Sequence, residues 1–167
     1  MDYIHELRKL TGPRKLILNC GGVVIEKDGK VLFQRRADNG KWGLIGGLVE
    51  MNETYAQAAV REAREETGLT LTSWRYRGIV TFLSSDYPET EYMHLFTADG
   101  FEGELSDCDE GELLWVPKER MRGFPTWEGD RIFLDLLDAD APFFSLKLKY
   151  EGDRLTEAVL NGKEKIR

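Results

Sequence analysis

The chain has 167 residues, 41% hydrophobic and 32% charged, which predicts one globular domain spanning residues 1–167. Its formal net charge of −7 argues against a polymeric nucleic acid as partner, because binding DNA or RNA requires a basic face. No apolar run approaches the ~20 residues of a membrane span, the N-terminus lacks a signal-peptide core, and the two cysteines form no CxxC pair, so we expect a cytoplasmic protein without membrane contact.

Three segments make up the first part of the chain. Residues 2–10 are expected to form a short helix. Residues 16–36 contain two apolar runs around Asp28-Gly29, a dipeptide that favours a tight turn between antiparallel strands. Residues 37–47 are rich in glycine and other turn-forming residues. These patterns predict a short helix, then a β-hairpin, then a turn-rich loop.

Residues 54–67 are predicted to form the first long helix. Thr54 and Gln57 have the spacing of a capping box, and Asn52 is the alternative N-cap. Gly68 suits the position just after the last turn, where many helices end in a left-handed backbone conformation. At ~100° per residue, one stripe of this helix is apolar and should face the core. The stripe consists of Ala56, Ala59, Val60 and Ala63.

The second part of the chain contains mostly strands and one more helix. Residues 69–85, 90–101 and 112–117 have the composition of strands. Residues 128–138 carry apolar side chains at helical spacing, and residues 143–160 alternate around a turn as a late hairpin does. Many strands with two main helices predict an α+β fold in which helices pack on the faces of a mixed sheet.

Three glutamates, Glu62, Glu65 and Glu66, lie on an arc of ~100° beside the apolar stripe of the first long helix. Spacings of three and four residues bring their carboxylates close together, and each like-charged pair destabilises a helix by roughly a few tenths of a kcal/mol. The arc is either a solvated charged face or a site for a hard cation such as Mg²⁺, which proteins bind through carboxylates and substrate phosphates. The surrounding spacing decides between these interpretations.

From Gly47 the chain reads GLVEMNETYAQAAVREAREETGL, that is, G-x5-E-x7-R-E-apolar-x-E-E-x-G-apolar. This pattern over residues 47–69 closely resembles the Nudix box, the signature of the Nudix hydrolases. Its seven fixed residues give a chance match on the order of 10⁻⁸ per start point. Ala63 is small for its apolar position. The resemblance implies a Nudix-type α/β/α sandwich with a mixed sheet and the hydrolysis of a nucleoside diphosphate linked to another group.

The resemblance also implies a divalent metal site. The metal is expected to be Mg²⁺, with Mn²⁺ as a substitute. Its implied ligands are the carboxylates of Glu62, Glu65 and Glu66 and the backbone carbonyl of Gly46.

Other residues of the box are expected to hold the loop and to move a proton. Glu53 is expected to pair with Arg61 and so to fix the loop to the helix. Gly47 allows the backbone to approach a phosphate without a Cβ. Glu62 is the first candidate for the general base that takes a proton from water. Glu110, outside the box, is the alternative base and a further candidate metal ligand.

The second half of the chain bears on the substrate. Residues 108–119, 124–137 and 143–155 resemble the corresponding regions of Nudix enzymes that hydrolyse purine nucleoside triphosphates, including the oxidised nucleotide 8-oxo-dGTP. Trp127 offers a flat face on which a purine can stack, and Asp130 offers a hydrogen-bonding group for its edge. The alternatives are that Trp127 anchors the second helix and that Asp130 stabilises its N-terminus.

Two further features bear on the phosphates and the base. Arg35 and Arg36 end a strand and face opposite ways, so either one of them meets a phosphate or both are surface arginines. After Trp42 several oxidised-purine enzymes carry a side-chain amide that reads the base, whereas this chain has Gly43.

We therefore expect an Mg²⁺-dependent pyrophosphohydrolase that converts a nucleoside triphosphate, such as 8-oxo-dGTP, to the monophosphate and pyrophosphate. ADP-ribose or another nucleoside diphosphate derivative is the alternative substrate. A non-catalytic nucleotide-binding module is less favoured, because the box keeps every acid. The partner is then a small-molecule nucleotide, and the protein is expected to be a monomer or a homodimer.

Overall fold

Helices and strands of the chain are defined by a computed structural model, which describes residues 3–37, 39–106 and 111–167. The helices are α1 (Tyr3–Thr11), α2 (Tyr55–Thr67) and α3 (Glu128–Asp138), with a 3₁₀ helix η1 (Lys118–Gly123). The longer strands are β1 (Ile17–Lys27), β2 (Lys30–Arg36), β5 (Thr70–Ser84), β6 (Thr90–Glu102), β7 (Gly111–Pro117), β8 (Phe144–Glu151) and β9 (Arg154–Leu160). Three short strands are β3 (Trp42–Gly43), β4 (Ile45–Leu48) and β10 (Glu164–Lys165).

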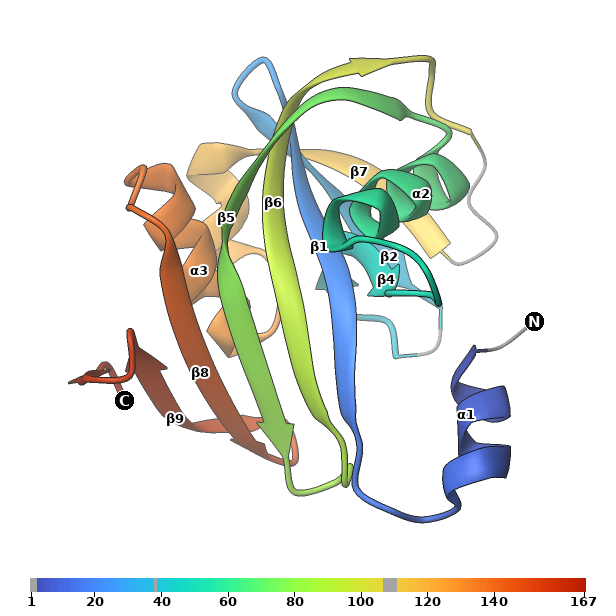
Figure 1. The fold of residues 1–167 in the computed structure, drawn as a ribbon. Coiled ribbons are helices and arrows are strands. Elements are labelled where there is room, and N and C mark those ends of the chain that lie inside the picture. Colours follow the sequence, from blue (N-terminus) through green and yellow to red (C-terminus); the bar gives the residue numbers. More distant parts are fainter. Residues whose placement is uncertain (1–2, 38, 107–110) are drawn as a thin grey trace.

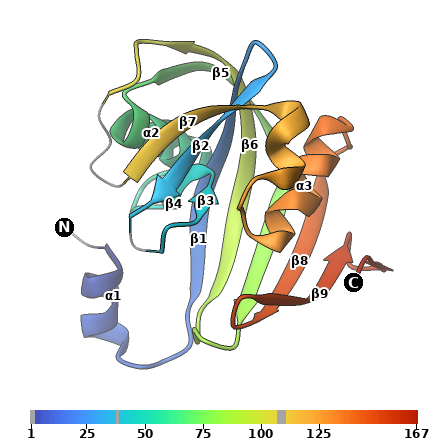
Figure 2. The same cartoon turned by 180° about the vertical axis from the view of Figure 1, so that it is seen from behind.

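The strands form a mixed sheet in the order β10-β9-β8-β5-β6-β1-β2-β3, with β4 paired to β1 and β7 paired to β2. β1 and β6 run parallel, as do β5 and β8, whereas the hairpin strands run antiparallel. Figure 1 and Figure 2 show α2 on one face of this sheet and α3 on the opposite face. The predicted α/β/α arrangement with a mixed sheet is confirmed.

The sheet separates two buried apolar clusters. Val23 and Val24 of β1 belong to different clusters, because successive side chains of a strand point to opposite faces. Both side chains are fully buried, and burial is continuous over residues 21–25 in the middle of β1, as expected for a strand covered on both faces. The α3 side also contains Phe33, Phe133, Leu146 and Leu148, and the α2 side contains Ile25, Ile45, Ala63 and Phe96.

The turns and helix caps that were predicted from a few neighbouring residues agree with the structure. The hairpin turns at Asp28-Gly29, and Thr54 caps α2 in a capping box with Gln57. Asn52 is not the N-cap; it lies two residues earlier in the loop. Gly68 ends α2 in the left-handed conformation, with φ of 80°.

Residues 37–47 were predicted as a loop, and that prediction is wrong in part. This segment contains β3 and the start of β4, which pair with β2 and β1 respectively. These strands have two and four residues, and their glycine-rich sequences favour turns. They are extended because they pair with long neighbouring strands. The local sequence contains no information about that pairing.

Helix α2 packs unusually close to β1 because β1 carries Gly21 at the contact. A Cβ at Gly21 would lie 2.8 Å from the backbone nitrogen of Ala59 and 2.9 Å from the backbone oxygen of Tyr55. Ala59 and Ala63 are buried as predicted, and Ala58, which lies outside the predicted stripe, is fully buried too. Contacts with β1, β4 and β5 together cover a wider arc of α2 than one apolar stripe.

Replacing Gly21 with alanine should therefore lower the free energy of unfolding by about 1–3 kcal/mol, the usual cost of overpacking a core. Gly43→Ala is the matched control, since a Cβ there would meet no atom within 4 Å. Urea unfolding of both variants measures the difference. Equal stabilities of Gly21→Ala and Gly43→Ala would show that α2 does not pack on β1 at this distance.

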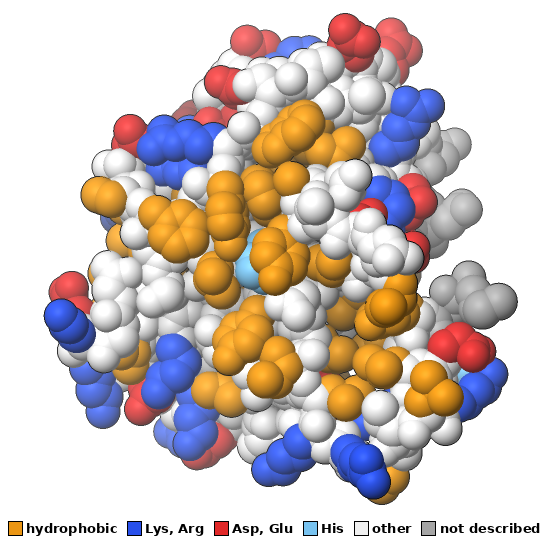
Figure 3. Space-filling view, viewed as in Figure 1, with side chains coloured by type: hydrophobic (Ala, Val, Ile, Leu, Met, Phe, Trp, Pro, Cys, Tyr) orange, Lys and Arg blue, Asp and Glu red, His pale blue; other side chains and the backbone are white. Residues whose placement is uncertain are grey.

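The sheet face below α2 carries aromatic side chains around His94 (Figure 3). Tyr55, at the start of α2, stacks on His94 with ring centroids 3.4 Å apart, and the Tyr76 hydroxyl lies 2.6 Å from His94 Nδ1. Burial lowers the pKa of His94, so it stays neutral at pH 7. His94 thus joins α2 to the sheet by packing.

Among the described residues, no helix is long and apolar enough to cross a membrane.

Candidate active site

The three glutamates of α2 differ in their exposure. Glu66 is buried, and its Oε2 accepts a hydrogen bond from the Gly46 backbone N–H at 3.3 Å. The Glu62 side chain is 14% exposed, whereas that of Glu65 is 61% exposed. Glu62 and Glu66 therefore lie against the glycine loop, and Glu65 lies at the solvent edge of the acidic face.

Arg61 is the hub of this acidic face. Its Nε and Nη2 donate to the two carboxylate oxygens of Glu53 at 2.9 and 3.1 Å, and Nη2 also donates to the Leu48 carbonyl at 2.9 Å. Its Nη1 donates to Glu62 at 2.6 Å and to Glu65 at 3.2 Å. One guanidinium thus joins the loop before α2 to two acids of the helix.

The electrostatics of the loop follow from this pairing. The hydrogen bonds from Arg61 hold the pKa of Glu53 below its usual range, and the Glu50 backbone N–H, 3.0 Å from Glu53 Oε2, adds to the effect. The same contacts raise the pKa of Arg61. Glu53 is therefore ionised at pH 7, and the ion pair that the resemblance implied is present.

The glycine pair before the box leaves no room for side chains. A Cβ at Gly47 would collide with the Glu62 carboxylate, and a Cβ at Gly46 would collide with the backbone of Gly21. The loop backbone can therefore lie directly beside the acids of α2. Only glycine lets the loop backbone come this close to the helix. A phosphate or a cation bound between loop and helix requires such a close backbone.

The donor chemistry of this face fits Mg²⁺, because carboxylate and backbone oxygens are the ligands that this hard cation prefers. Within the described ranges, which omit Glu110, no three Asp, Glu, His or Cys side chains lie close enough together to share a metal ion. Arg61 draws Glu62 and Glu65 toward Glu53. Metal ligation by the three glutamates therefore stays a prediction, as does any role of Glu110.

The two arginines at the end of β2 have different surroundings. Arg35 is exposed and directed toward β7, where its Nη1 lies 3.9 Å from Glu112, and its Nε donates to the Gly40 carbonyl at 3.3 Å. Burial raises the pKa of Glu91 on β6, and the charge of Arg36 partly offsets that rise. Both arginines are exposed at the end of β2, so a phosphate contact stays a prediction for either of them.

At the start of α3, Trp127 and Asp130 lie next to Tyr150 of β8. The rings of Trp127 and Tyr150 make an edge contact, with centroids 5.5 Å apart and an angle of 80°. The Tyr150 hydroxyl accepts a hydrogen bond from the Gly129 backbone N–H at 2.8 Å. Asp130 is only 7% exposed, and burial raises its pKa to about 7, an effect that a hydrogen bond with the Trp127 backbone partly offsets.

The raised pKa of Asp130 predicts a pH effect on stability. The folded protein keeps a proton that the unfolded chain releases near the ordinary value of 3.8. Hence the Asp130 contribution to the free energy of unfolding is greatest below this value, falls as the pH rises toward about 7, and is then constant. Urea unfolding between these pH values should show this decline in wild type and a flatter profile in Asp130→Asn. Parallel profiles would mean that the carboxyl is not desolvated.

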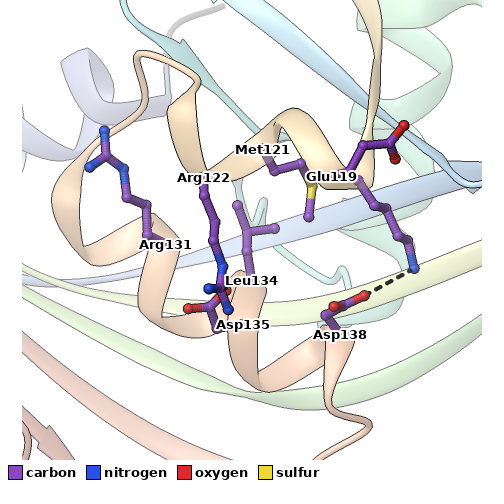
Figure 4. Close-up of a pocket in the computed structure, with 8 residues that line it drawn as sticks. Glu119, Met121, Arg122, Arg131, Leu134, Asp135 and Asp138 are labelled. Carbon is purple, nitrogen blue, oxygen red and sulfur yellow. Dashed lines mark hydrogen bonds and ion pairs between the residues drawn. The ribbon is translucent and has the colours of Figure 1, made fainter.

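Two concavities differ in their position relative to the acidic face. One, of about 340 Å³, lies between η1 and α3. Arg122 lies 3.2 Å from Asp135 and Lys118 lies 3.9 Å from Asp138, whereas Figure 4 shows Arg131 and Glu119 pointing away from these pairs. The other, of about 590 Å³, lies along α2 by Trp74 and borders the acidic face, because Arg61 and Glu65 contribute to its lining. In the first concavity the charged side chains either pair with one another or point away, so they do not converge on one ligand position. We therefore place the candidate site at the acidic face and at Trp127.

Sequence reasoning missed several residues near the candidate site. Cys20 of β1 is one: burial raises the pKa of its thiol to about 12, and the charges of Glu91 and Glu62 add to this rise. The alternation of side chains along a strand could have placed Cys20 and Glu91 on the same face of the sheet. That inference requires knowing that β1 and β6 pair, which only the structure shows. Tyr150 and Lys41 are the others, and they reach Trp127 from distant segments.

Comparison with known proteins places these features in a family. Residues 15–137 match the model of the NUDIX domain. The chain is 32% identical over 125 residues to an uncharacterised Nudix hydrolase of Bacillus subtilis, covering 72% of this chain and 77% of that protein. It is 33% identical over 118 residues to the oxidized purine nucleoside triphosphate hydrolase of Danio rerio, covering 69% and 76%.

Among solved structures, the mutator MutT protein of Bacillus halodurans has the same fold, with a TM-score of 0.81 at 23% identity, covering 88% of this chain and 99% of that one. The acidic face of α2, the ion pair that ties it to the preceding loop and the glycine turn beside it all lie within the matched segment. The chain therefore belongs to the Nudix hydrolases, enzymes that act on phosphoric anhydride bonds.

Proposed function

We propose that this chain is an Mg²⁺-dependent pyrophosphohydrolase that cleaves a purine nucleoside triphosphate, with oxidised purines such as 8-oxo-dGTP as candidate substrates, to the monophosphate and pyrophosphate. The observation that carries the proposal is the presence of two features in the same chain. One is the acidic face of α2 against the glycine loop. The other is Trp127 with the buried carboxyl of Asp130 at the start of α3.

We assign the metal to Glu62, Glu65, Glu66 and the backbone carbonyl of Gly46. Bound Mg²⁺ polarises phosphoryl oxygens and lowers the pKa of a water molecule. Glu62 then acts as general base, because it is the least exposed acid of this face apart from Glu66 and lies directly against Gly47. Glu110 stays the alternative base.

The remaining residues bind the substrate. Arg35 or Arg36 neutralises phosphate charge, and Trp127 stacks on the base. Asp130 is partly protonated near pH 7, so its carboxyl can both donate and accept a hydrogen bond at a purine edge. The likeness to an oxidized purine nucleoside triphosphate hydrolase supports this substrate class. Gly43, which replaces the amide side chain of several such enzymes, favours the runner-up, ADP-ribose or another nucleoside diphosphate derivative.

A substrate panel tests the proposal. The kcat/KM values for 8-oxo-dGTP, dGTP, dATP and ADP-ribose are measured with Mg²⁺ for wild type and Trp127→Ala. We expect a purine triphosphate to rank first, and we expect Trp127→Ala to raise its KM about 5–150-fold, the equivalent of ~1–3 kcal/mol of stacking. The control is Tyr87→Ala, which removes an exposed aromatic side chain from the loop between β5 and β6 and should change neither value.

Two outcomes would overturn the substrate assignment. If ADP-ribose has the highest kcat/KM in wild type, the runner-up is correct. If Trp127→Ala remains folded and keeps the wild-type KM, the tryptophan is a packing residue. In either case the hydrolysis of a phosphoric anhydride would stand, and only the second outcome would remove the base site.

A further inference from the structure

The face of Trp127 is covered by an ammonium group. Lys41 Nζ lies 3.3 Å from the centroid of the Trp127 ring. The backbone of Lys41 is fixed in the loop between β2 and β3: its N–H donates to Asn39 Oδ1 at 2.9 Å, and its carbonyl accepts from the Arg36 N–H at 2.9 Å. The loop therefore places this side chain over the ring.

A second contact holds the ammonium in place. Asp153, in the turn between β8 and β9, lies 2.9 Å from Lys41 Nζ. Lys41 is 29% exposed and Asp153 is 78% exposed, so the pair lies at the rim of the site and is open to solvent. Three segments far apart in sequence, the β2–β3 loop, the start of α3 and the β8–β9 turn, thus meet at one ring.

The ammonium and a base cannot occupy the same ring face. A stacked base lies at van der Waals distance over the ring, which is the position that Lys41 Nζ holds. Trp127 is partly buried against the core cluster and makes an edge contact with Tyr150, so its ring is partly covered before a base arrives. Stacking on this face of Trp127 therefore requires Lys41 to leave.

We propose that Lys41, held by Asp153, is an affinity-determining residue of the base subsite: its ammonium competes with a purine base for Trp127. This inference rests on the proposed function, since it takes Trp127 as the stacking surface. A cation over an exposed aromatic face is favoured by about 2–5-fold, and base stacking is favoured by about 5–150-fold. A purine can displace the lysine, at a cost in affinity that removal of the lysine should abolish.

The test measures binding without chemistry. The dissociation constant for dGMP is determined by calorimetry in EDTA for wild type, Lys41→Ala, Asp153→Asn and Trp127→Ala. The control is Lys147→Ala, which removes the same charge from an ion pair with Glu157 on the other face of β8. Thermal unfolding of each variant confirms that the loop change leaves the fold intact.

We expect Lys41→Ala to bind dGMP about 2–5-fold more tightly than wild type, which corresponds to the loss of the cation–π contact. Asp153→Asn should fall between wild type and Lys41→Ala, because it frees the ammonium without removing it. Lys147→Ala should match wild type or bind slightly more weakly, as loss of a positive charge alone predicts.

Unchanged or weaker binding by both Lys41→Ala and Asp153→Asn would overturn the inference. If Trp127→Ala still weakens binding in that case, the base subsite stands and only the competition is wrong. If Trp127→Ala binds as wild type does, the base subsite itself is wrong, and the inference falls with it.

Discussion

Replacing Glu62 with glutamine is expected to lower kcat by about 10²–10⁴-fold, the contribution of a positioned general base. The amide keeps the size of the side chain and one oxygen acceptor for Arg61, so the fold should persist. Glu66→Gln should weaken Mg²⁺ binding and also lower kcat strongly. Steady-state kinetics with varied Mg²⁺ and calorimetric titration of Mg²⁺ measure the two effects separately.

Glu104→Gln, which neutralises an exposed acid outside the box, is the control and should behave as wild type. A normal kcat in Glu62→Gln with a strong loss in Glu66→Gln would move the general base away from Glu62 and leave Glu110 as the candidate. Near-normal turnover in both box variants would contradict the assignment of the metal to α2.

The second large effect is expected at Arg61. Arg61→Lys replaces a planar fork of five donors by a point charge, so it cannot bind both oxygens of Glu53 and the Leu48 carbonyl together. Each hydrogen bond to a charged group contributes ~1.5–3 kcal/mol, so we expect the free energy of unfolding to fall by at least about that amount. Displacement of the glycine loop should lower kcat/KM by up to about 10²-fold.

A double-mutant cycle with Glu53→Gln isolates the tether from other effects of the substitution. The coupling energy between Arg61 and Glu53 in urea unfolding should be about 0.5–3 kcal/mol. Additive losses, with no coupling, would mean that the ion pair does not fix the loop to α2. Loss of activity without loss of stability would instead assign Arg61 to the substrate.

The structure also shows which features the sequence predicts and why others escape it. The turn at Asp28-Gly29, the Thr54 cap and the Gly68 C-cap depend on a few neighbouring residues, so local pattern was sufficient. The Glu53–Arg61 pair spans eight residues and was expected only because the segment resembles a known signature.

Features formed by distant segments could not be predicted. β3 and β4 are extended because β2 and β1 pair with them, although their own residues favour turns. The contact of Lys41 with Trp127 and Asp153 requires the β2–β3 loop to meet the β8–β9 turn, which no local pattern reports. The buried Asp130 could be named from the sequence, but its raised pKa depends on burial that only the packing of α3 creates.

The most direct test of the central claim is the identity of the products released with Mg²⁺. Wild-type protein is incubated with 8-oxo-dGTP or dGTP, and the phosphorus-containing products are separated and quantified. The proposed function predicts the nucleoside monophosphate and pyrophosphate in equal amounts, no reaction in EDTA, and recovery on addition of Mg²⁺ or Mn²⁺. Release of the nucleoside diphosphate and orthophosphate, or equal turnover in EDTA, would contradict it.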